Sequence, residues 1–204
     1  MKRTVTFGEI MLRLKTPEHM RILQTDAFEA SYGGAEANVA VSLAVLKDPV
    51  SFVTKLPENP VGTAALNEVR RYGADTSKVV IGGSRLGIYF FEKGTDIRPT
   101  NVVYDREGSA LALAKPEEFH WDEILKDTDI FYFSGVTPAV SENIAKAVLE
   151  ALKYCKAHGI ETVCDLNYRS KMWDTKKAQS VMSELMNYVT LCIANDEDFE
   201  SSLG

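Results

Sequence analysis

The feature of this chain best suited to binding a small molecule is a pair of adjacent glycines directly before a predicted hydrophobic helix. They lie in residues 32–38, which read YGGAEAN, directly before the apolar stretch 39–46. Because Gly33 and Gly34 carry no Cβ atom, a ligand can approach the main chain, and the free amides of a helix's first turn point outward as donors. Asn38 adds a side-chain amide one turn later. The pattern also fits a tight turn before a core helix, and the segment alone does not decide.

Polar residues also follow each of four predicted strands. They are Gly8-Glu9 after the first strand, Ser134-Gly135 after 130–133, residues 165–169 (DLNYR) after 160–164, and residues 195–198 (NDED) after 191–194. In an open parallel sheet, ligands bind beyond the carboxyl ends of the strands. Each polar end could instead be a helix cap, but several together favour a binding site.

Two common signatures are absent from the sequence. There is no G-x-x-x-x-G-K-[ST] phosphate loop, and no G-x-G-x-x-G follows a strand, which disfavours a dehydrogenase-like dinucleotide domain. The three histidines, His19, His120 and His158, lack the spacing of metal ligands, so we expect neither a zinc site nor a histidine base.

Composition narrows the class of protein. The 204 residues are 45% hydrophobic and 25% charged, as in one ordinary soluble domain. The net charge of -6 with scattered Lys and Arg argues against a nucleic-acid or membrane partner, so an acidic ligand would need dedicated local arginines. No targeting signal precedes the first strand, which predicts a cytoplasmic protein. Cys155, Cys164 and Cys192 are expected to be reduced core residues.

The periodicity predicts the elements that must position these residues. Short apolar strands are expected near 4–10, 50–55, 130–133, 160–164 and 190–194. Helices are expected near 35–47 and 60–72, along an apolar stripe from Ile144 to Cys155 that stops at His158-Gly159, and behind a cap at Asp174 or Thr175. This alternation predicts β-α-β units and a mostly parallel sheet with helices on both faces.

Two stretches depart from this alternation. Residues 11–32 and 85–107 contain segments of period two with no helical pattern between them, which predicts antiparallel hairpins. Hairpins outside the β-α-β units indicate a small separate sheet, which could be an edge, a lid over a site or a dimer contact. The sequence leaves these three alternatives open.

Together the motifs resemble the ribokinase-like family of carbohydrate kinases, and within it the 2-keto-3-deoxygluconate kinases. The resemblance rests on Gly8-Glu9, the GGAxAN run at 33–38, NVVYDR at 101–106, Asp165-x-Asn167-x-Arg169 and Asn195-x-x-Asp198. It implies an α/β fold, a three-layer α/β/α sandwich with a mostly parallel sheet and a small β lid formed by about 11–32 and 86–107. Residues 1–204 would then be a single incomplete domain, truncated at the C-terminal end. The resemblance also implies a homo-oligomer, a dimer through the lid.

The resemblance assigns residues to substrate binding. The implied set is Glu9, Gly33, Gly34 and Asn38 around the glycines, Tyr89, Tyr104 and Arg106 from the lid, and Asn167 and Arg169 from below. A planar guanidinium can grip the carboxylate of a sugar acid with two charge-assisted bonds, which suits Arg106 and Arg169. Either Arg alone could equally form a surface ion pair, and Tyr89 could serve lid packing.

The resemblance further implies ATP and Mg²⁺ as cofactors. Asn195 and Asp198 match the family's Asn-x-x-Glu element, which organises magnesium and phosphate, usually through water. Asp in the last position keeps the carboxylate but shortens the side chain by one bond, and Glu197 beside it could compensate.

The family's anion hole and catalytic base lie beyond Gly204, so we expect no catalytic base in this chain and little or no turnover by the chain alone. The leading hypothesis is the sugar-acid-binding portion of an ATP-dependent carbohydrate kinase that phosphorylates 2-keto-3-deoxygluconate on its terminal hydroxyl. A fructokinase or another neutral-sugar kinase is the alternative within the family. A non-catalytic sugar-binding or assembly module is the alternative from another class, and nucleotide binding would separate the two classes.

Overall fold

A central sheet of five parallel strands organises the computed structural model, which describes residues 2–204. Its order is β11-β10-β9-β1-β4, with β1 (Thr4–Phe7), β4 (Val50–Val53), β9 (Ile130–Ser134), β10 (Glu161–Asp165) and β11 (Leu191–Ile193). Every neighbouring pair is parallel, so the carboxyl ends of all five strands lie at one edge. The predicted α/β fold with a mostly parallel sheet is confirmed.

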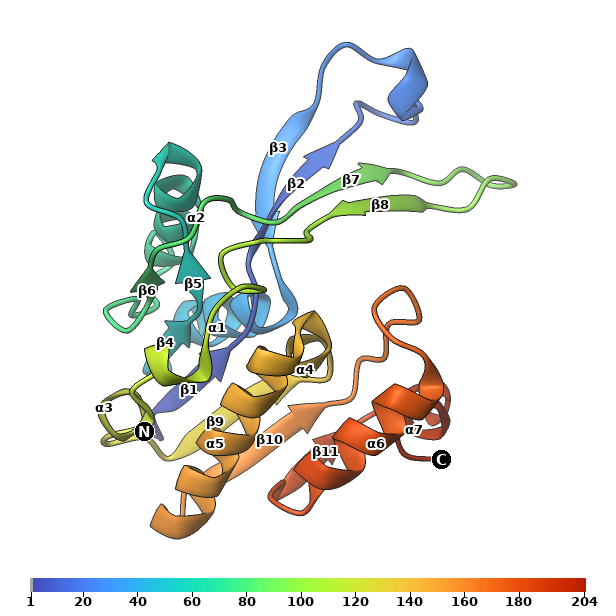
Figure 1. Cartoon of the computed structure of the whole chain (residues 1–204). Coiled ribbons are helices and arrows are strands. Elements are labelled where there is room, and N and C mark those ends of the chain that lie inside the picture. Colours follow the sequence, from blue (N-terminus) through green and yellow to red (C-terminus); the bar gives the residue numbers. More distant parts are fainter. Residues whose placement is uncertain (1) are drawn as a thin grey trace.

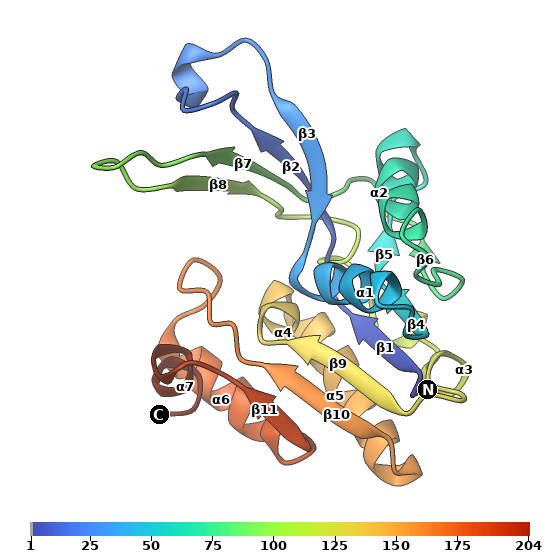
Figure 2. The same cartoon turned by 180° about the vertical axis from the view of Figure 1, so that it is seen from behind.

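Helices lie on both faces of this sheet. On one face, α5 (Glu142–His158) and α6 (Thr175–Met186) cover the strands, and α1 (Ala35–Val45) lies on the other (Figures 1 and 2). The apolar stripe of α5 packs against Phe131 and Phe133 of β9 in the main core. Asp174 caps α6 by accepting a hydrogen bond from the Lys177 amide at 2.8 Å, so the cap lies at the first of the two predicted positions.

The remaining helical elements include one of the same length as α1 and several shorter ones. They are α2 (Pro60–Arg70), α3 (Trp121–Ile124), α4 (Val136–Val140), α7 (Asp196–Leu203) and two 3₁₀ turns, η1 (Ile22–Gln24) and η2 (Pro116–Glu118). The strand predicted near 50–55 is in fact divided: β4 ends at Val53, and β5 (Lys55–Leu56) pairs with β6 (Val80–Ile81) in a separate two-stranded sheet.

A second sheet stands over the carboxyl edge of the first (Figure 1). Its order is β3-β2-β7-β8, with β2 (Met11–Lys15), β3 (Glu29–Gly33), β7 (Ile88–Glu92) and β8 (Asn101–Asp105), and we call it the lid sheet. The pairs β2/β3 and β7/β8 are antiparallel, as predicted for hairpins. The hairpins are joined by a parallel pairing of β2 with β7 that the sequence did not predict. Since β3 ends one residue before Gly34, the lid sheet runs directly into α1.

One part of the central sheet lies bare in the described residues. On the α1 side, β10 and β11 carry no helix within residues 2–204 (Figure 2), and Leu191 and Ile193 of β11 are 55% and 50% exposed. Cys155 and Cys164 are buried as predicted, but Cys192 is exposed on β11, so the prediction of a core position is wrong for that residue. It fails because β11 has a neighbour on only one side. In residues 2–204, no helix is long and apolar enough to cross a membrane.

Candidate substrate-binding site

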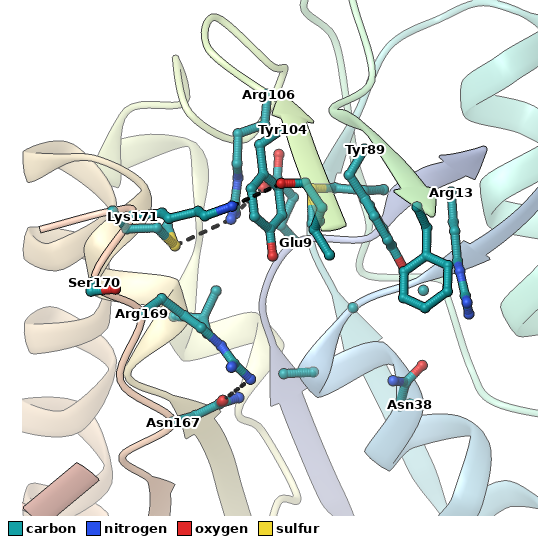
Figure 3. A pocket seen from close by; sticks show the side chains of 18 of the residues that line it. Glu9, Arg13, Asn38, Tyr89, Tyr104, Arg106, Asn167, Arg169, Ser170 and Lys171 are labelled. Atoms are coloured by element: carbon teal, nitrogen blue, oxygen red, sulfur yellow. Dashed lines mark hydrogen bonds and ion pairs between the residues drawn. The ribbon is translucent and has the colours of Figure 1, made fainter. Parts of the chain in front are cut away.

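A cavity of about 660 Å³ lies between the lid sheet and the carboxyl edge of the central sheet. Its walls come from the lid strands, the glycine turn before α1 and the loop after β10 (Figure 3). All nine predicted substrate-binding residues line it: Glu9, Gly33, Gly34, Asn38, Tyr89, Tyr104, Arg106, Asn167 and Arg169. The fold therefore brings together residues that lie up to 160 positions apart (9 to 169) in the sequence.

The two glycines have different structural roles. A Cβ atom on Gly34 would lie 1.9 Å from the carbonyl oxygen of Glu9, so only glycine fits where the turn packs against the chain after β1. A Cβ on Gly33 would find Asn38 Oδ1 and the Tyr89 hydroxyl no closer than 3.7 Å, so Gly33 leaves open space on the cavity side. Asn38 is exposed at the cavity, and its main-chain N–H donates to the Gly34 carbonyl at 2.8 Å in the first turn of α1, which leaves its side-chain amide free for a ligand in the described residues.

The lid sheet supplies aromatic and cationic groups from above. Tyr89 of β7 is paired in register with Tyr104 of β8, and their ring centroids are 5.9 Å apart. Arg13 of β2 is paired with Tyr89, and its guanidinium lies 4.1 Å from the ring centroid of Phe91. Burial raises the pKa of Tyr89, an effect that the Arg13 charge partly opposes. The Tyr89 hydroxyl therefore stays protonated at neutral pH and can donate a hydrogen bond.

Glu9 and Arg106 form an ion pair at the edge of the cavity (Figure 3). Glu9 is 5% exposed, and its other carboxylate oxygen accepts from the Ser109 hydroxyl at 2.5 Å. Arg106 also contacts the Met172 sulfur at 3.2 Å, which fixes its guanidinium from a second side. Both Glu9 oxygens thus have protein partners, so the geometry makes Glu9 a support for Arg106.

The loop after β10 forms the wall opposite the lid. Asn167 has a φ of 39°, in the left-handed region that Asn tolerates better than most residues, and its side-chain oxygen accepts from Arg169. Lys171 donates to the Val102 carbonyl of β8 at 2.8 Å, so this loop touches the lid sheet across the cavity. Arg13 and Lys171 also line the cavity, and neither was predicted from the sequence; Lys171 lies two residues after Arg169, which was a signal for it.

The cavity has a positive excess of charge. Four cationic side chains line it, Arg13, Arg106, Arg169 and Lys171, against the single carboxylate of Glu9. This local excess occurs in a chain whose net charge is -6. Guanidinium groups in such a setting suit a carboxylate or another small anion.

A second cavity, of about 790 Å³, adjoins the first and shares Asn167 and Arg169 with it. Its lining includes Asn195 and Asp198, together with the carboxylates of Asp165 and Glu197. Burial and the neighbouring Asp198 charge raise the pKa of Asp165. The second cavity is therefore rich in oxygen atoms that could bind a metal ion, and it lies beside the first cavity, whose lining is mainly cationic.

Asn195 has a local structural role in this second cavity. Its side-chain oxygen accepts from the Asp198 amide at 2.7 Å, which caps α7, and its side-chain nitrogen donates to Asp198 Oδ2 at 3.1 Å. In the part of the chain that the structure describes, no three His, Cys, Asp or Glu side chains are grouped closely enough to hold a metal ion directly. The oxygen-rich lining fits a hydrated magnesium ion, which keeps several of its waters.

The fold is ribokinase-like, and comparison with known proteins gives the family. The chain belongs to the pfkB family of carbohydrate kinases, which matches residues 1–204. Among its relatives is the 2-dehydro-3-deoxygalactonokinase of Haloferax volcanii, 38% identical over 199 residues, covering 98% of this chain and 62% of the relative.

Solved structures agree with this assignment. The 2-dehydro-3-deoxygluconokinase of Thermotoga maritima is 49% identical, with a TM-score of 0.98 over 100% of this chain and 63% of that protein. A PfkB family carbohydrate kinase from Listeria grayi is 37% identical, with a TM-score of 0.95 over 98% of this chain and 63% of that protein. The chain thus spans less than two thirds of the length of these relatives.

Proposed function

We propose that this chain forms the sugar-acid-binding portion of an ATP-dependent kinase that phosphorylates 2-keto-3-deoxygluconate on its terminal hydroxyl. The observation that carries the proposal is the meeting of Arg106, Arg169 and Lys171 with the glycine turn in one cavity. A sugar acid has a carboxylate for the cations and hydroxyls for the surrounding amide and phenol groups. The kinases of 2-dehydro-3-deoxy sugar acids among the relatives support the same substrate class.

In this proposal, different residues of the cavity bind different parts of the ligand. Arg106 and Arg169 bind the carboxylate, with Glu9 and Met172 holding Arg106 in place. Asn38 and the main chain at Gly33 and Gly34 bind hydroxyls from below, and Tyr89 and Tyr104 contact the sugar from the lid sheet. Asn167 orients Arg169 through their hydrogen bond.

We propose that the phosphoryl donor reaches the sugar from the second cavity. Asn195 and Asp198 would hold magnesium through water, and the bound ion would neutralise phosphate charge during transfer. ATP as donor follows from membership of this kinase family. A kinase that consumes ATP would act in the cytoplasm, and the lid sheet would supply the contact of a homo-oligomer.

The choice of substrate has defined alternatives. The relative from Haloferax volcanii is named for the galactonate form of the acid, which presents the same kind of carboxylate. A neutral sugar such as fructose would leave the cationic cluster without a partner, and desolvated unpaired charges weaken binding. A non-catalytic sugar-binding module would bind the acid but would not respond to a nucleotide.

Isothermal titration of the chain tests the proposal. Titrants are 2-keto-3-deoxygluconate, 2-keto-3-deoxygalactonate and fructose, each with and without magnesium-ATP, beside a phosphotransfer assay. We expect binding of the acids, weaker binding of fructose and no turnover. Equal affinity for fructose would contradict the acid assignment, and full turnover would mean that a base lies among Asp165, Glu197 and Asp198.

A further inference from the structure

Glu36 is a fully buried carboxylic acid that the proposed sugar contacts do not use. It lies in the first turn of α1, between the glycine turn and Asn38, and is 1% exposed. It is not among the residues that line the cavity. Burial raises the pKa of Glu36, because the charged form loses its hydration. Burial of a carboxyl group costs free energy unless hydrogen bonds compensate for the lost hydration, so the partners of Glu36 must supply these bonds.

The Glu36 side chain crosses from α1 to the end of β9. Its Oε1 accepts from the Ser134 amide at 2.9 Å, the Ser134 hydroxyl at 2.5 Å and the Thr137 hydroxyl at 2.8 Å. The Thr137 hydroxyl also lies 3.2 Å from the Phe7 carbonyl of β1. A Cβ atom on Gly8 would lie 2.0 Å from Glu36 Oε2, so Gly8 makes room for the carboxyl group. The side chain thus joins α1 to β9 and α4, and Thr137 extends the link to β1.

Two of these elements, α1 and α4, contribute residues to the cavity floor. α1 begins at the glycine turn and presents Asn38, and Val136 of α4 lines the cavity directly. Gly135, between Ser134 and Val136, donates its amide to the Asp165 carbonyl at 2.8 Å, where the loop bearing Asn167 begins. The floor is therefore built from segments that meet around one buried carboxyl group.

We propose that Glu36 is a positioning residue that fixes the first turn of α1 against β9 and α4, and so sets the place of Asn38 and the glycine turn. Hydrogen bonds to a carboxyl group are strong in a buried setting, and three of them to one oxygen restrict its movement. Small displacements of a binding group lower affinity steeply. The identity of the ligand rests on the proposed function, whereas the fixing of α1 does not.

The first test follows hydrogen exchange in the free chain. Glu36→Ala could prevent folding, so the informative variant is Thr137→Val, which removes one donor to Glu36 at nearly constant volume. Thr54→Val is the matched control, because Thr54 is also 0% exposed and its hydroxyl has no partner in the described residues. Glu36→Gln keeps an oxygen that can accept the same bonds.

We expect Thr137→Val to speed exchange of the hydrogen-bonded amides at 38–41 by about tenfold, the effect of one lost hydrogen bond. Exchange in α5 should change less than twofold. Thr54→Val and Glu36→Gln should leave exchange at 38–41 within threefold of the parent chain. Equal acceleration throughout the chain, or none at 38–41, would overturn the proposal.

The second test is a double-mutant cycle on binding of 2-keto-3-deoxygluconate. Thr137→Val should weaken binding about fivefold in the parent chain but less than twofold in an Asn38→Ala background, because its effect passes through Asn38. Additive losses, or an unchanged dissociation constant with a lowered melting temperature, would reduce Glu36 to a structural residue. If the parent chain binds no sugar acid, the proposed function fails while the exchange test still decides the role of Glu36.

Discussion

Removing the Arg106 guanidinium is the most direct perturbation of the proposed acid site. In Arg106→Ala the carboxylate of a bound sugar acid would lose one charge-assisted partner, which is worth about 1.5–3 kcal/mol. At about 1.4 kcal/mol per factor of ten, the affinity for 2-keto-3-deoxygluconate should fall by about 10- to 150-fold. Fructose has no carboxylate, so its affinity should fall by less than about threefold, a ratio that titration calorimetry resolves.

The structure also predicts a cost in stability that must be separated from binding. Glu9 is 5% exposed, and without Arg106 only Ser109 would remain as its partner. Removing one member of a buried pair costs about 3–5 kcal/mol, and the 14% exposure of the Arg106 side chain places this case toward the lower end. Glu9→Gln combined with Arg106→Ala removes the stranded charge and should restore much of the melting temperature.

Two controls make the comparison specific. Arg106→Lys keeps the charge but loses the planar fork, so its acid affinity should lie between those of the parent and Arg106→Ala. Arg169→Ala should weaken acid binding with little effect on stability, because Arg169 is exposed and its side chain bonds only to Asn167 among the described residues. Equal loss of acid and fructose affinity in the stabilised double variant would show that Arg106 does not bind the carboxylate.

Four further perturbations follow from the geometry. Gly34→Ala should lower the melting temperature by the equivalent of about 1–3 kcal/mol, because its Cβ would clash with backbone, whereas Gly33→Ala should melt like the parent but bind the sugar acid less tightly. Lys171→Met should speed amide exchange in β8 and weaken acid binding, because it removes the bond from the loop to the lid sheet; unchanged exchange would contradict this. The pKa of Asp165 is raised in the folded chain, so the folded state binds a proton at this carboxyl group more tightly than the unfolded state does. This stabilisation is complete below the ordinary pKa of 3.8, and it is lost as the pH rises through the pKa of the folded state. Asp165→Asn should therefore melt higher than the parent near pH 7 and lose this advantage near pH 4. The bare face of β11 should make the chain associate with rising concentration, and Leu191→Lys should reduce this; light scattering that shows a monomer with a sharp two-state melt would contradict it.

The layered plan of the chain could be predicted from its amino-acid sequence. Apolar strands alternating with helical stripes predicted the parallel sheet, because hydrophobic period follows directly from strand and helix geometry. The parallel arrangement then predicted that Glu9, Asn167 and Arg169 would meet, since the carboxyl ends of parallel strands share one edge. The Gly-Gly turn and the Asp174 cap were also predictable, because both depend on neighbouring residues.

The hydrogen-bond and ion-pair partners of these groups depend on contacts between distant segments, and the three-dimensional structure was needed to find them. The bond of Glu36 to Thr137 spans 101 positions and the pair of Glu9 with Arg106 spans 97, so no local pattern contains them. The parallel pairing of β2 with β7, and the reach of Lys171 to the lid sheet, likewise depend on register between distant segments. Exposure of Cys192 followed from the position of β11 at the sheet edge, which an apolar run cannot reveal. Local chemistry thus set the elements and their polar ends, whereas side-chain contacts between distant segments set which groups are free to meet a ligand.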